Sequence, residues 1–110
     1  MSQARKRRGY RTQKVVAEYL QANGWPYAES TGAGRSGADI TGTVGLSFEV
    51  KARTDLNPIG WVKQAEKNTG LPIVVFRSNG QGEDAGKYLA MLRFADLVEL
   101  LREAGYGDKP

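Results

Sequence analysis

The sequence predicts a small α/β sandwich in which helices flank a mixed β-sheet. Hydrophobic periodicity along the 110 residues gives the order helix, three strands, helix, two strands and a final helix. A βαβ crossover spans residues 46–77, and a crossover of this kind joins parallel strands. A chain of this length suffices for one modest core, so we expect a single domain.

An amphipathic helix is predicted for residues 11–23. Its apolar face is formed at helical spacing by Val15, Val16, Tyr19 and Leu20. Gly24 suits the left-handed residue that often ends a helix. Residues 25–30 (WPYAES) then predict a short edge strand, because proline cannot donate to a β-ladder. The glycine-rich residues 31–38 predict a flexible loop.

Two strands joined by a tight connection around Gly45 are predicted for residues 38–43 and 46–52. Side chains in the second strand alternate between two faces. One face carries Leu46, Phe48 and Val50, and the other carries Ser47, Glu49 and Lys51. Glu49 and Lys51 are therefore expected to be neighbours on the same face of the sheet.

The second half of the chain predicts two more helices and two more strands. Asn57 caps a helix that begins with a proline and runs to about Asn68. Its inward residues are expected to be Ile59, Val62 and Ala65. Residues 72–76 (PIVVF) predict a strand buried on both faces, and residues 87–92 (KYLAML) predict another strand. The final amphipathic helix has its apolar face at Phe94, Leu97, Val98, Leu101 and Ala104, and ends at Gly105.

Composition excludes several classes of protein. With no cysteine and no histidine, the chain has neither disulfides nor a zinc finger, and it lacks the commonest general base. Catalysis would rest on carboxylates, lysine, arginine, hydroxyls or a metal with oxygen ligands, which favours Mg²⁺ or Mn²⁺. No long apolar run is present. We therefore expect a cytoplasmic protein with neither membrane span nor secretory signal.

Positive charge is concentrated at the N-terminus. Residues 1–14 carry six basic residues and no acid, whereas the remaining 10 basic and 12 acidic residues sum to −2. This divides the chain into a basic arm at residues 1–10, a domain at 11–106 and a tail at 107–110. Such an arm suits contact with DNA phosphates, where neutralisation releases counterions. The alternative is a solvated tail that aids solubility.

Asp39, Glu49 and Lys51 form a candidate active site. Strand pairing about Gly45 brings Asp39 and Glu49 close enough for their oxygens to share one divalent cation. Two carboxylates at this separation repel each other unless a cation lies between them. Lys51, on the same face as Glu49, could orient a water or stabilise developing negative charge. The alternative is a solvent-facing ion pair of Glu49 and Lys51, with Asp39 ending a turn.

Three motifs resemble a known family. The helix ends in ANGW (22–25), a loop leads into GADI (37–40), and the strand contains FEVKA (48–52). The chain resembles the PD-(D/E)XK nuclease superfamily over most of its length, and within it the archaeal-type Holliday junction resolvases and their phage relatives. The resemblance implies a restriction-endonuclease-like sandwich, with a mixed central sheet flanked by helices.

The resemblance also implies a mechanism and a biological role. Asp39 and Glu49 would bind Mg²⁺, with Mn²⁺ as a substitute and the backbone carbonyl of Val50 as a further ligand. Lys51 would activate or position the water that hydrolyses the phosphodiester. The implied activity is an endodeoxyribonuclease that resolves junctions in DNA recombination and repair, in the cytoplasm of its cell or of a phage's host. Because four-way junctions have two-fold symmetry, the expected assembly is a homodimer.

This chain departs from the family at several positions. Gln13 stands where the resolvases carry a metal-binding glutamate, and it offers a neutral oxygen in place of a charge. Glu18 is expected to face solvent, and Ala38 replaces the family's proline, which is not a ligand. The family's loop serine has three candidates, which are Ser30, Thr31 and Ser36.

Eight residues are predicted to contact DNA, most of them in the arm or flanking the site. They are Arg5, Lys6, Arg7, Arg8, Arg11, Arg35, Ser36 and Arg53. Gln64 could face the site, although a solvated helix face is favoured, and Trp25 and Trp61 are expected in a core or interface rather than stacked on bases. Two alternatives stay open: a nuclease of the same fold acting on other DNA structures, and a catalytically idle DNA-binding module. A generic α/β interaction domain would bind no metal.

Overall fold

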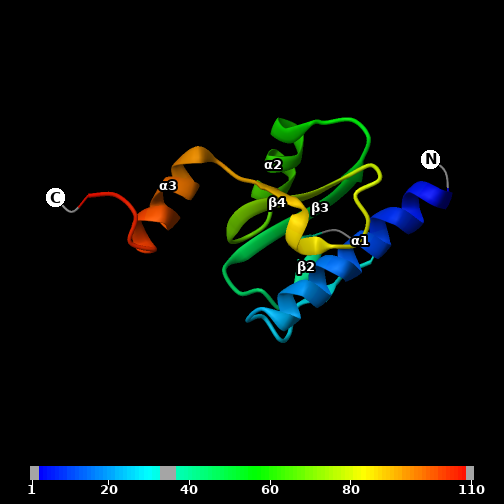
Figure 1. Cartoon of the computed structure of the whole chain (residues 1–110), viewed down its shortest axis with the longest axis horizontal. Helices are drawn as coiled ribbons and strands as arrows, with labels where there is room; N and C mark the ends of the chain where they lie inside the picture. Colours follow the sequence, from blue (N-terminus) through cyan, green and yellow to red (C-terminus); the bar gives the residue numbers. More distant parts are fainter. Residues whose placement is uncertain (1–2, 33–36, 109–110) are drawn as a thin grey trace.

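A mixed three-stranded sheet lies between two helices, and a third helix extends away from it (Figure 1). The computed structural model describes residues 3–32 and 37–108, with side chains from residue 7 onward. The elements are α1 (Gln3–Ala22), β1 (Glu29–Ser30), β2 (Ile40–Thr41), β3 (Leu46–Arg53), α2 (Pro58–Glu66), β4 (Leu71–Ser78), a 3₁₀ turn (Ala85–Lys87), β5 (Leu89–Met91) and α3 (Phe94–Glu103). The α/β class and the order of elements are as predicted.

The sheet has the order β3-β4-β5, and α2 connects its two parallel strands. Leu46 lies opposite Leu71, and the register continues to Arg53 opposite Ser78. β5 is antiparallel to β4, so the predicted mixed sheet is confirmed. β1 and β2 form a separate two-stranded antiparallel pair. This pair lies on the side of β3 away from β4, where the Asp39 backbone N–H donates to the Phe48 carbonyl at 3.0 Å.

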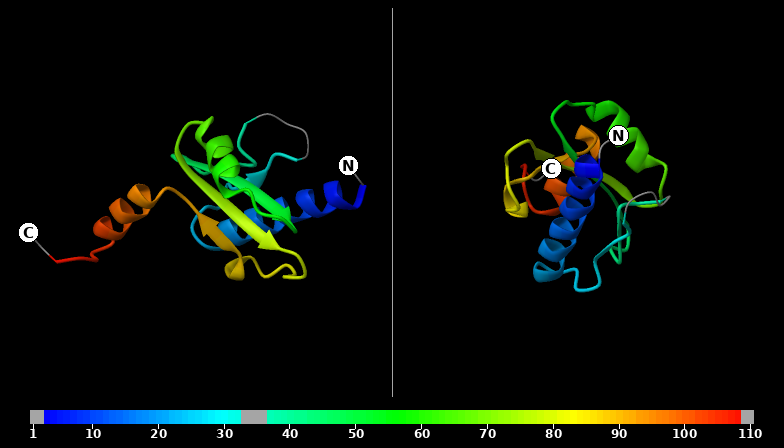
Figure 2. Two further views of the ribbon diagram at one scale, coloured as in Figure 1. Left: turned by 90° about the horizontal axis from the view of Figure 1, so that it is seen from above. Right: turned by 90° about the vertical axis from the view of Figure 1, so that its right-hand side faces the viewer.

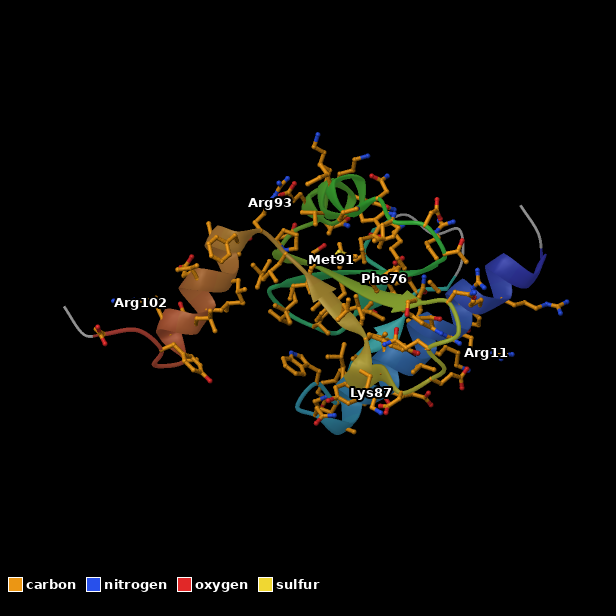
Figure 3. The ribbon with its side chains drawn as sticks, turned by 45° about the horizontal axis from the view of Figure 1, so that its top comes forward. Arg11, Phe76, Lys87, Met91, Arg93 and Arg102 are labelled. Atoms are coloured by element: carbon orange, nitrogen blue, oxygen red, sulfur yellow. The ribbon has the colours of Figure 1, made fainter. Side chains whose placement is uncertain are left out.

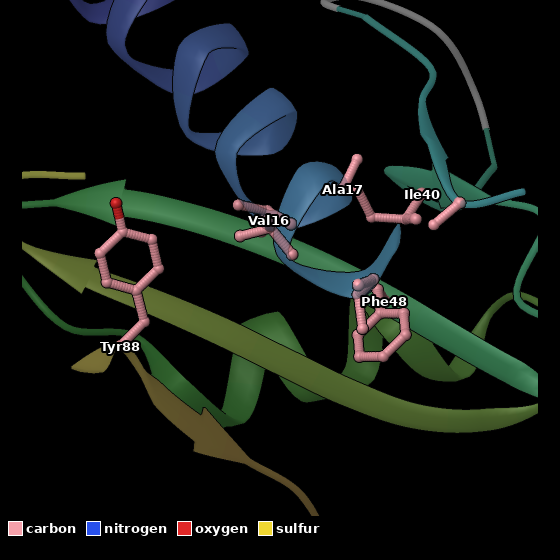
Figure 4. Close-up of a cluster of buried hydrophobic side chains, with 8 residues drawn as sticks. Val16, Ala17, Ile40, Phe48 and Tyr88 are labelled. Carbon is pink, nitrogen blue, oxygen red and sulfur yellow. The ribbon is translucent and has the colours of Figure 1, made fainter. Parts of the chain in front are cut away.

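Two hydrophobic clusters form on opposite faces of the sheet. The first lies under α1 and contains Val16, Ala17, Leu20, Ala28, Ile40, Phe48, Val50 and Tyr88 (Figure 4). The second lies under α2 and contains Trp61, Val62, Ala65, Val74 and Phe76. β4 contributes alternate residues to both clusters, which confirms that this strand is covered on both faces.

α2 is rotated about its axis by part of a turn relative to the prediction, so it buries a different face. Trp61 is 7% exposed and stacks on Phe76 with ring centroids 5.6 Å apart, whereas Ile59 is 57% exposed. The prediction that Ile59 points inward is therefore wrong, because the larger aromatic ring occupies the space over β4. The expectation of a packed Trp61 is confirmed, while Trp25, after α1, is more than one-third exposed.

The N-terminal helix is longer than predicted. α1 begins at Gln3, so residues 3–10 of the predicted arm continue the helix in place of a separate extension. Arginine, lysine and alanine favour helices, and Gly9 alone does not interrupt one. The predicted edge strand at 25–30 is reduced to Glu29–Ser30, and β2 is likewise only two residues long.

α3 forms as predicted but contributes no buried residue to the domain. It projects along the 53 Å long axis, at the end opposite the start of α1 (Figures 1 and 2). Its attachment is an ion pair in which Arg93 donates to Glu66 of α2 at 3.0 and 3.1 Å. The apolar face expected for this helix is thus present, and no residue of it is buried by the described part of the chain.

Candidate active site

Asp39 is held against the free edge of β3 by two hydrogen bonds. Its backbone N–H donates to the Phe48 carbonyl, and its carboxylate Oδ2 accepts the Val50 N–H at 2.8 Å. Thr31 holds the preceding loop, because its backbone N–H donates to the Asp39 carbonyl at 3.0 Å. The hairpin-like return of the chain therefore sets Asp39 beside residues 48–50, as predicted.

Two glycines make this return of the chain feasible. Gly42 has a φ of +76°, and a Cβ at this position would collide with the Tyr27 carbonyl oxygen. Gly45 has a φ of +83°, and its carbonyl accepts the Leu71 N–H at 2.8 Å. Both positions favour glycine because other residues rarely adopt a left-handed backbone. The turn thereby fixes the register that carries Asp39 and Glu49.

Glu49 is a buried acid on the face of β3 that α2 covers. Its side chain is 2% exposed, and the neighbouring Ser47 on this face donates to the Ala65 carbonyl of α2 at 2.7 Å. The Glu49 Oε2 atom lies 3.8 Å from Lys51 Nζ and has no hydrogen-bond partner. A buried carboxylate oxygen without a partner is costly, and it marks a candidate position for a ligand.

Burial raises the pKa of both carboxyl groups, and the charge of Asp39 raises that of Glu49 further. Burial, followed by the negative charge of Asp39, raises the pKa of Glu49 to about 7, although Lys51 opposes the shift. Burial also raises the pKa of Asp39, and the hydrogen bond from Val50 N–H and the charge of Lys51 oppose this. A proton or a metal cation between the two groups would relieve the repulsion.

Lys51 is fixed beside Glu49 by a residue of α2. Its Nζ donates to Gln64 Oε1 at 2.9 Å, and its side chain is 12% exposed. Gln64 therefore contacts the site, and it also lies on a solvent-exposed face of α2, as the sequence favoured. The parallel crossover was the signal for this contact, because it lays α2 across the face that carries Glu49 and Lys51.

Gln13 lies on α1, the helix that packs against the other face of β3. It is 8% exposed, and its Oε1 is buried without a hydrogen-bond partner.

The neighbouring Thr12 is fully buried; it donates to the Arg8 carbonyl at 2.7 Å and accepts from Arg77 Nη1 at 3.1 Å. Arg77, on β4 opposite Ala52, was not identified from the sequence. The sequence signal that could have identified Arg77 was a charged residue directly after the apolar run of β4.

The donor set fits a hard divalent cation with few protein ligands. Over residues 3–32 and 37–108, no group of three or more His, Cys, Asp or Glu residues gathers at one point. A cation here would use the carboxylates of Asp39 and Glu49 together with neutral oxygens, which Mg²⁺ accepts along with water. The unpartnered Oε2 of Glu49 is one of the carboxylate oxygens, whereas the unpartnered neutral oxygen, Gln13 Oε1, belongs to α1 on the other face of β3. The Val50 carbonyl is another, because it shares a strand edge with the N–H that Asp39 accepts.

The predicted DNA contacts differ in accessibility. Arg7, Arg11 and Lys14 are exposed on α1 and line a shallow pocket of about 450 Å³ with Glu83, which forms an ion pair with Arg11 at 3.7 Å. Arg8 turns partly inward, and its Nε is buried. The half-buried Arg53 ends β3. Arg5 and Lys6 are predicted contacts whose backbone lies in α1 and whose side chains are outside the described set; Arg35 and Ser36 lie outside the described residues.

Comparison with models of known protein families, with curated proteins and with solved structures found no match to this chain. Within the described part of the chain, no helix combines the length and apolar character that crossing a membrane requires. The fold and the site together define an α/β domain with a paired-carboxylate and lysine centre at the edge of a parallel strand. The chemistry of this centre is the basis for assigning a function.

Proposed function

We propose that this protein is a Mg²⁺-dependent endonuclease that hydrolyses DNA phosphodiester bonds, and that its substrate is the four-way Holliday junction. One observation carries the proposal: Asp39, Glu49 and Lys51 gather at one strand edge, and the buried Glu49 Oε2 has no hydrogen-bond partner. If these groups served only the stability of the fold, a hydrogen bond to Glu49 Oε2 would make the folded state more stable, and we would expect one to be present. The sequence resemblance to PD-(D/E)XK nucleases supports the same residues.

Each residue of the site has a distinct role in this proposal. Asp39 and Glu49 would hold Mg²⁺ with the Val50 carbonyl, and Gln13, on α1 at the other face of β3, would offer a neutral oxygen in place of the family's glutamate. When bound, Mg²⁺ supplies charge neutralisation at the scissile phosphate and lowers the pKa of a bound water. Lys51, positioned by Gln64, directs its ammonium group toward the attacking water or the phosphate oxygens. Glu49 must lose its proton before the cation binds, because its pKa is raised to about 7.

DNA binding is assigned to the basic face of α1. Arg7, Arg11 and Lys14 are exposed there, and basic side chains on one helix face bind phosphates without reading bases. Recombination and repair are the corresponding roles. The choice of a four-way junction rests on the sequence resemblance, and it calls for two active sites related by two-fold symmetry.

A DNA-binding module without catalysis is the second candidate. Gln13 adds no charge, and Lys51 already lies 3.8 Å from Glu49, so the site has less negative charge than a three-carboxylate site. Such a module would bind DNA through the same exposed basic residues of α1. The two candidates therefore differ in whether a phosphodiester is cut, and binding alone does not separate them.

Cleavage of an immobile four-way junction and a matched linear duplex tests the proposal. Each substrate is incubated with Mg²⁺, Mn²⁺ or chelator and with natural protein, Glu49→Gln, or the exposed control Glu99→Gln on α3. We expect symmetric, metal-dependent incision of the junction that is lost in Glu49→Gln and kept in Glu99→Gln. Equal cutting of both substrates would indicate a general nuclease of the same fold. Tight binding without cutting, even in Mn²⁺, would show that the second candidate is correct.

A further inference from the structure

Two arginines flank a buried threonine where the first half of α1 crosses β4. The hydroxyl of Thr12 accepts from Arg77 Nη1 at 3.1 Å and donates to the carbonyl of Arg8, one helical turn earlier, at 2.7 Å. Ile73 and Val75 pack against the cluster under α1, so strand alternation directs Arg77 to the same face of the sheet. Both arginines are half-buried, and the Nε of Arg8 is buried without a hydrogen-bond partner. Positive charge is therefore concentrated where the helix meets the strand.

Neither arginine forms an ion pair with a residue whose side chain the structure describes. The acids of the loop between β4 and β5 already have basic partners on α1 and in the 3₁₀ turn. These pairs are Glu83 with Arg11 and Asp84 with Lys87, and Figure 3 labels the two bases. The other residues, 1–6, 33–36 and 109–110, contain no aspartate or glutamate. A half-buried cation without a counter-ion costs stability, so the two arginines mark a candidate position for an anion.

The chemistry of these side chains favours a phosphate. A guanidinium is planar, has five N–H donors and matches the oxygens of a phosphate in pairs. Within the described chain Arg77 donates only to Thr12, which leaves its other donors for a ligand. Arg7, Arg11 and Lys14 are exposed on an adjoining face of α1. A basic surface of this extent attracts a polyanion such as DNA more strongly than a single acidic side chain.

We propose that Arg8 and Arg77 form a subsite for a backbone phosphate of DNA, in which Thr12 orients the Arg77 guanidinium. Arg77 lies opposite Ala52, the residue after Lys51. Because Arg77 bonds to α1 and Lys51 bonds to α2, their side chains lie on opposite faces of the sheet. The subsite therefore holds a phosphate other than the scissile one. The inference rests on the assignment of DNA as the ligand, but it does not depend on cleavage.

DNA affinity measured in chelator tests the subsite without cleavage. Arg77→Met should bind a linear duplex about tenfold more weakly, and the slope of log affinity against log salt should fall by about 1. Arg102→Met removes an equal charge from α3 and should change neither quantity. An unchanged affinity and slope in Arg77→Met would overturn the proposal. Natural protein that binds DNA without cutting it would count against the nuclease alone, whereas no binding to DNA would overturn both.

Thr12→Val separates the charge of the subsite from its structure. This variant lacks the hydroxyl that orients Arg77 but keeps both arginines, so DNA binding should weaken by about 2- to 5-fold with the salt slope unchanged. Circular dichroism verifies that each variant is folded. An equal loss of slope in Thr12→Val and Arg77→Met would overturn the proposal, because the effect would then come from the contact between helix and strand.

Thermal unfolding in inorganic phosphate gives a measurement without DNA. At equal ionic strength, phosphate should raise the unfolding temperature of the natural protein by about 2 °C or more above its value in chloride. The increase should be smaller in Arg77→Met and unchanged in Arg102→Met. Equal increases in all three proteins would show that phosphate binds elsewhere, and the subsite would be wrong.

Discussion

The edge of β3 and helix α3 depart from ordinary burial in opposite directions. At the strand edge an acid, Glu49, is 2% exposed, whereas on α3 a large aromatic residue, Phe94, is 78% exposed. Folded proteins usually expose acids and bury large apolar groups. Each departure costs stability unless a ligand or partner compensates for it. The comparison teaches that the two regions lack different things: among the described residues, the buried Glu49 oxygen has no hydrogen-bond donor, and the apolar face of α3 has no packed surface over it.

The two regions also differ in how the fold supports them. β3 is packed between α1 and α2, and hydrogen bonds to Asp39, Lys51 and Ser47 fix its polar groups. α3 is attached by one exposed ion pair, and exposed pairs contribute little stability. The rigid scaffold therefore surrounds the site, where distances of a few tenths of an ångström matter for catalysis. The apolar helix has no comparable support from the rest of the described chain.

Removal of the Lys51 charge should have the largest effect. If Lys51 stabilises charge on the attacking water or phosphate, Lys51→Met should lower the cleavage rate by about 100-fold or more under single-turnover conditions. Lys51→Arg should not restore the full rate, because the guanidinium differs in size and hydrogen-bonding geometry. Junction affinity should change much less than the rate. A rate within a few-fold of the natural protein would contradict the assigned role.

The stability of the folded protein should depend on both pH and Mg²⁺, because protons and the cation compete for the same carboxylates. The pKa of Glu49 is raised from its ordinary value of 4.5 to about 7, so the folded state holds this proton more tightly than the unfolded state. Without metal, stability should fall as pH rises from 4.5 to about 7 and stay low above it. Glu49→Gln should lack this fall, and at pH 8 should be about 1 kcal/mol more stable.

Thermal unfolding with Mg²⁺ and with chelator checks this linkage at pH 6 and pH 8. Mg²⁺ binds the ionised carboxylates, so its stabilising effect should be larger at pH 8. Glu99→Gln, which removes an exposed acid from α3, serves as the matched control and should respond as the natural protein does. Equal stabilisation of Glu49→Gln by Mg²⁺ would show that the cation binds elsewhere.

Truncation of Gln64 should have a smaller effect than removal of the lysine. Gln64→Ala removes the hydrogen bond to Lys51 Nζ but leaves the charge, so cleavage should slow by about 3- to 10-fold. The change should appear in the rate rather than in DNA affinity. Lys63→Ala, at an exposed neighbouring position on α2, provides the control. Equal losses in both variants would indicate a general effect on α2.

Local patterns predicted the strands of the site well. The alternation of residues 46–52 gave the faces of β3, and the short return through Gly45 predicted Asp39 close to Glu49, where the structure has it bonded to the Val50 N–H. Both follow from interactions between residues close in sequence, where strand period and turn geometry leave little choice. The parallel crossover followed from element order and length.

Contacts between distant segments were harder to predict. The bonds of Lys51 with Gln64 and of Arg77 with Thr12 depend on how each helix is rotated on the sheet, which periodicity gives only approximately. The rotation of α2 about its axis was uncertain by part of a turn for the same reason, so the prediction pointed Ile59 inward where the structure buries Trp61. For α3, amphipathicity indicated an apolar face but carried no information about what covers it.

Removal of α3 should have the smallest effect on the stability of the monomer. A chain that ends at Arg93 loses no buried residue, so its free energy of unfolding should fall by less than about 1 kcal/mol. Val74→Ala, at a fully buried position of β4, should cost about 2 kcal/mol in the same urea titration. Because the core is shared by α1, α2 and the sheet, the truncated chain should still unfold in one transition. A loss as large as that of Val74→Ala would mean that α3 belongs to the cooperative unit, and its exposed apolar face would then need an explanation within the monomer.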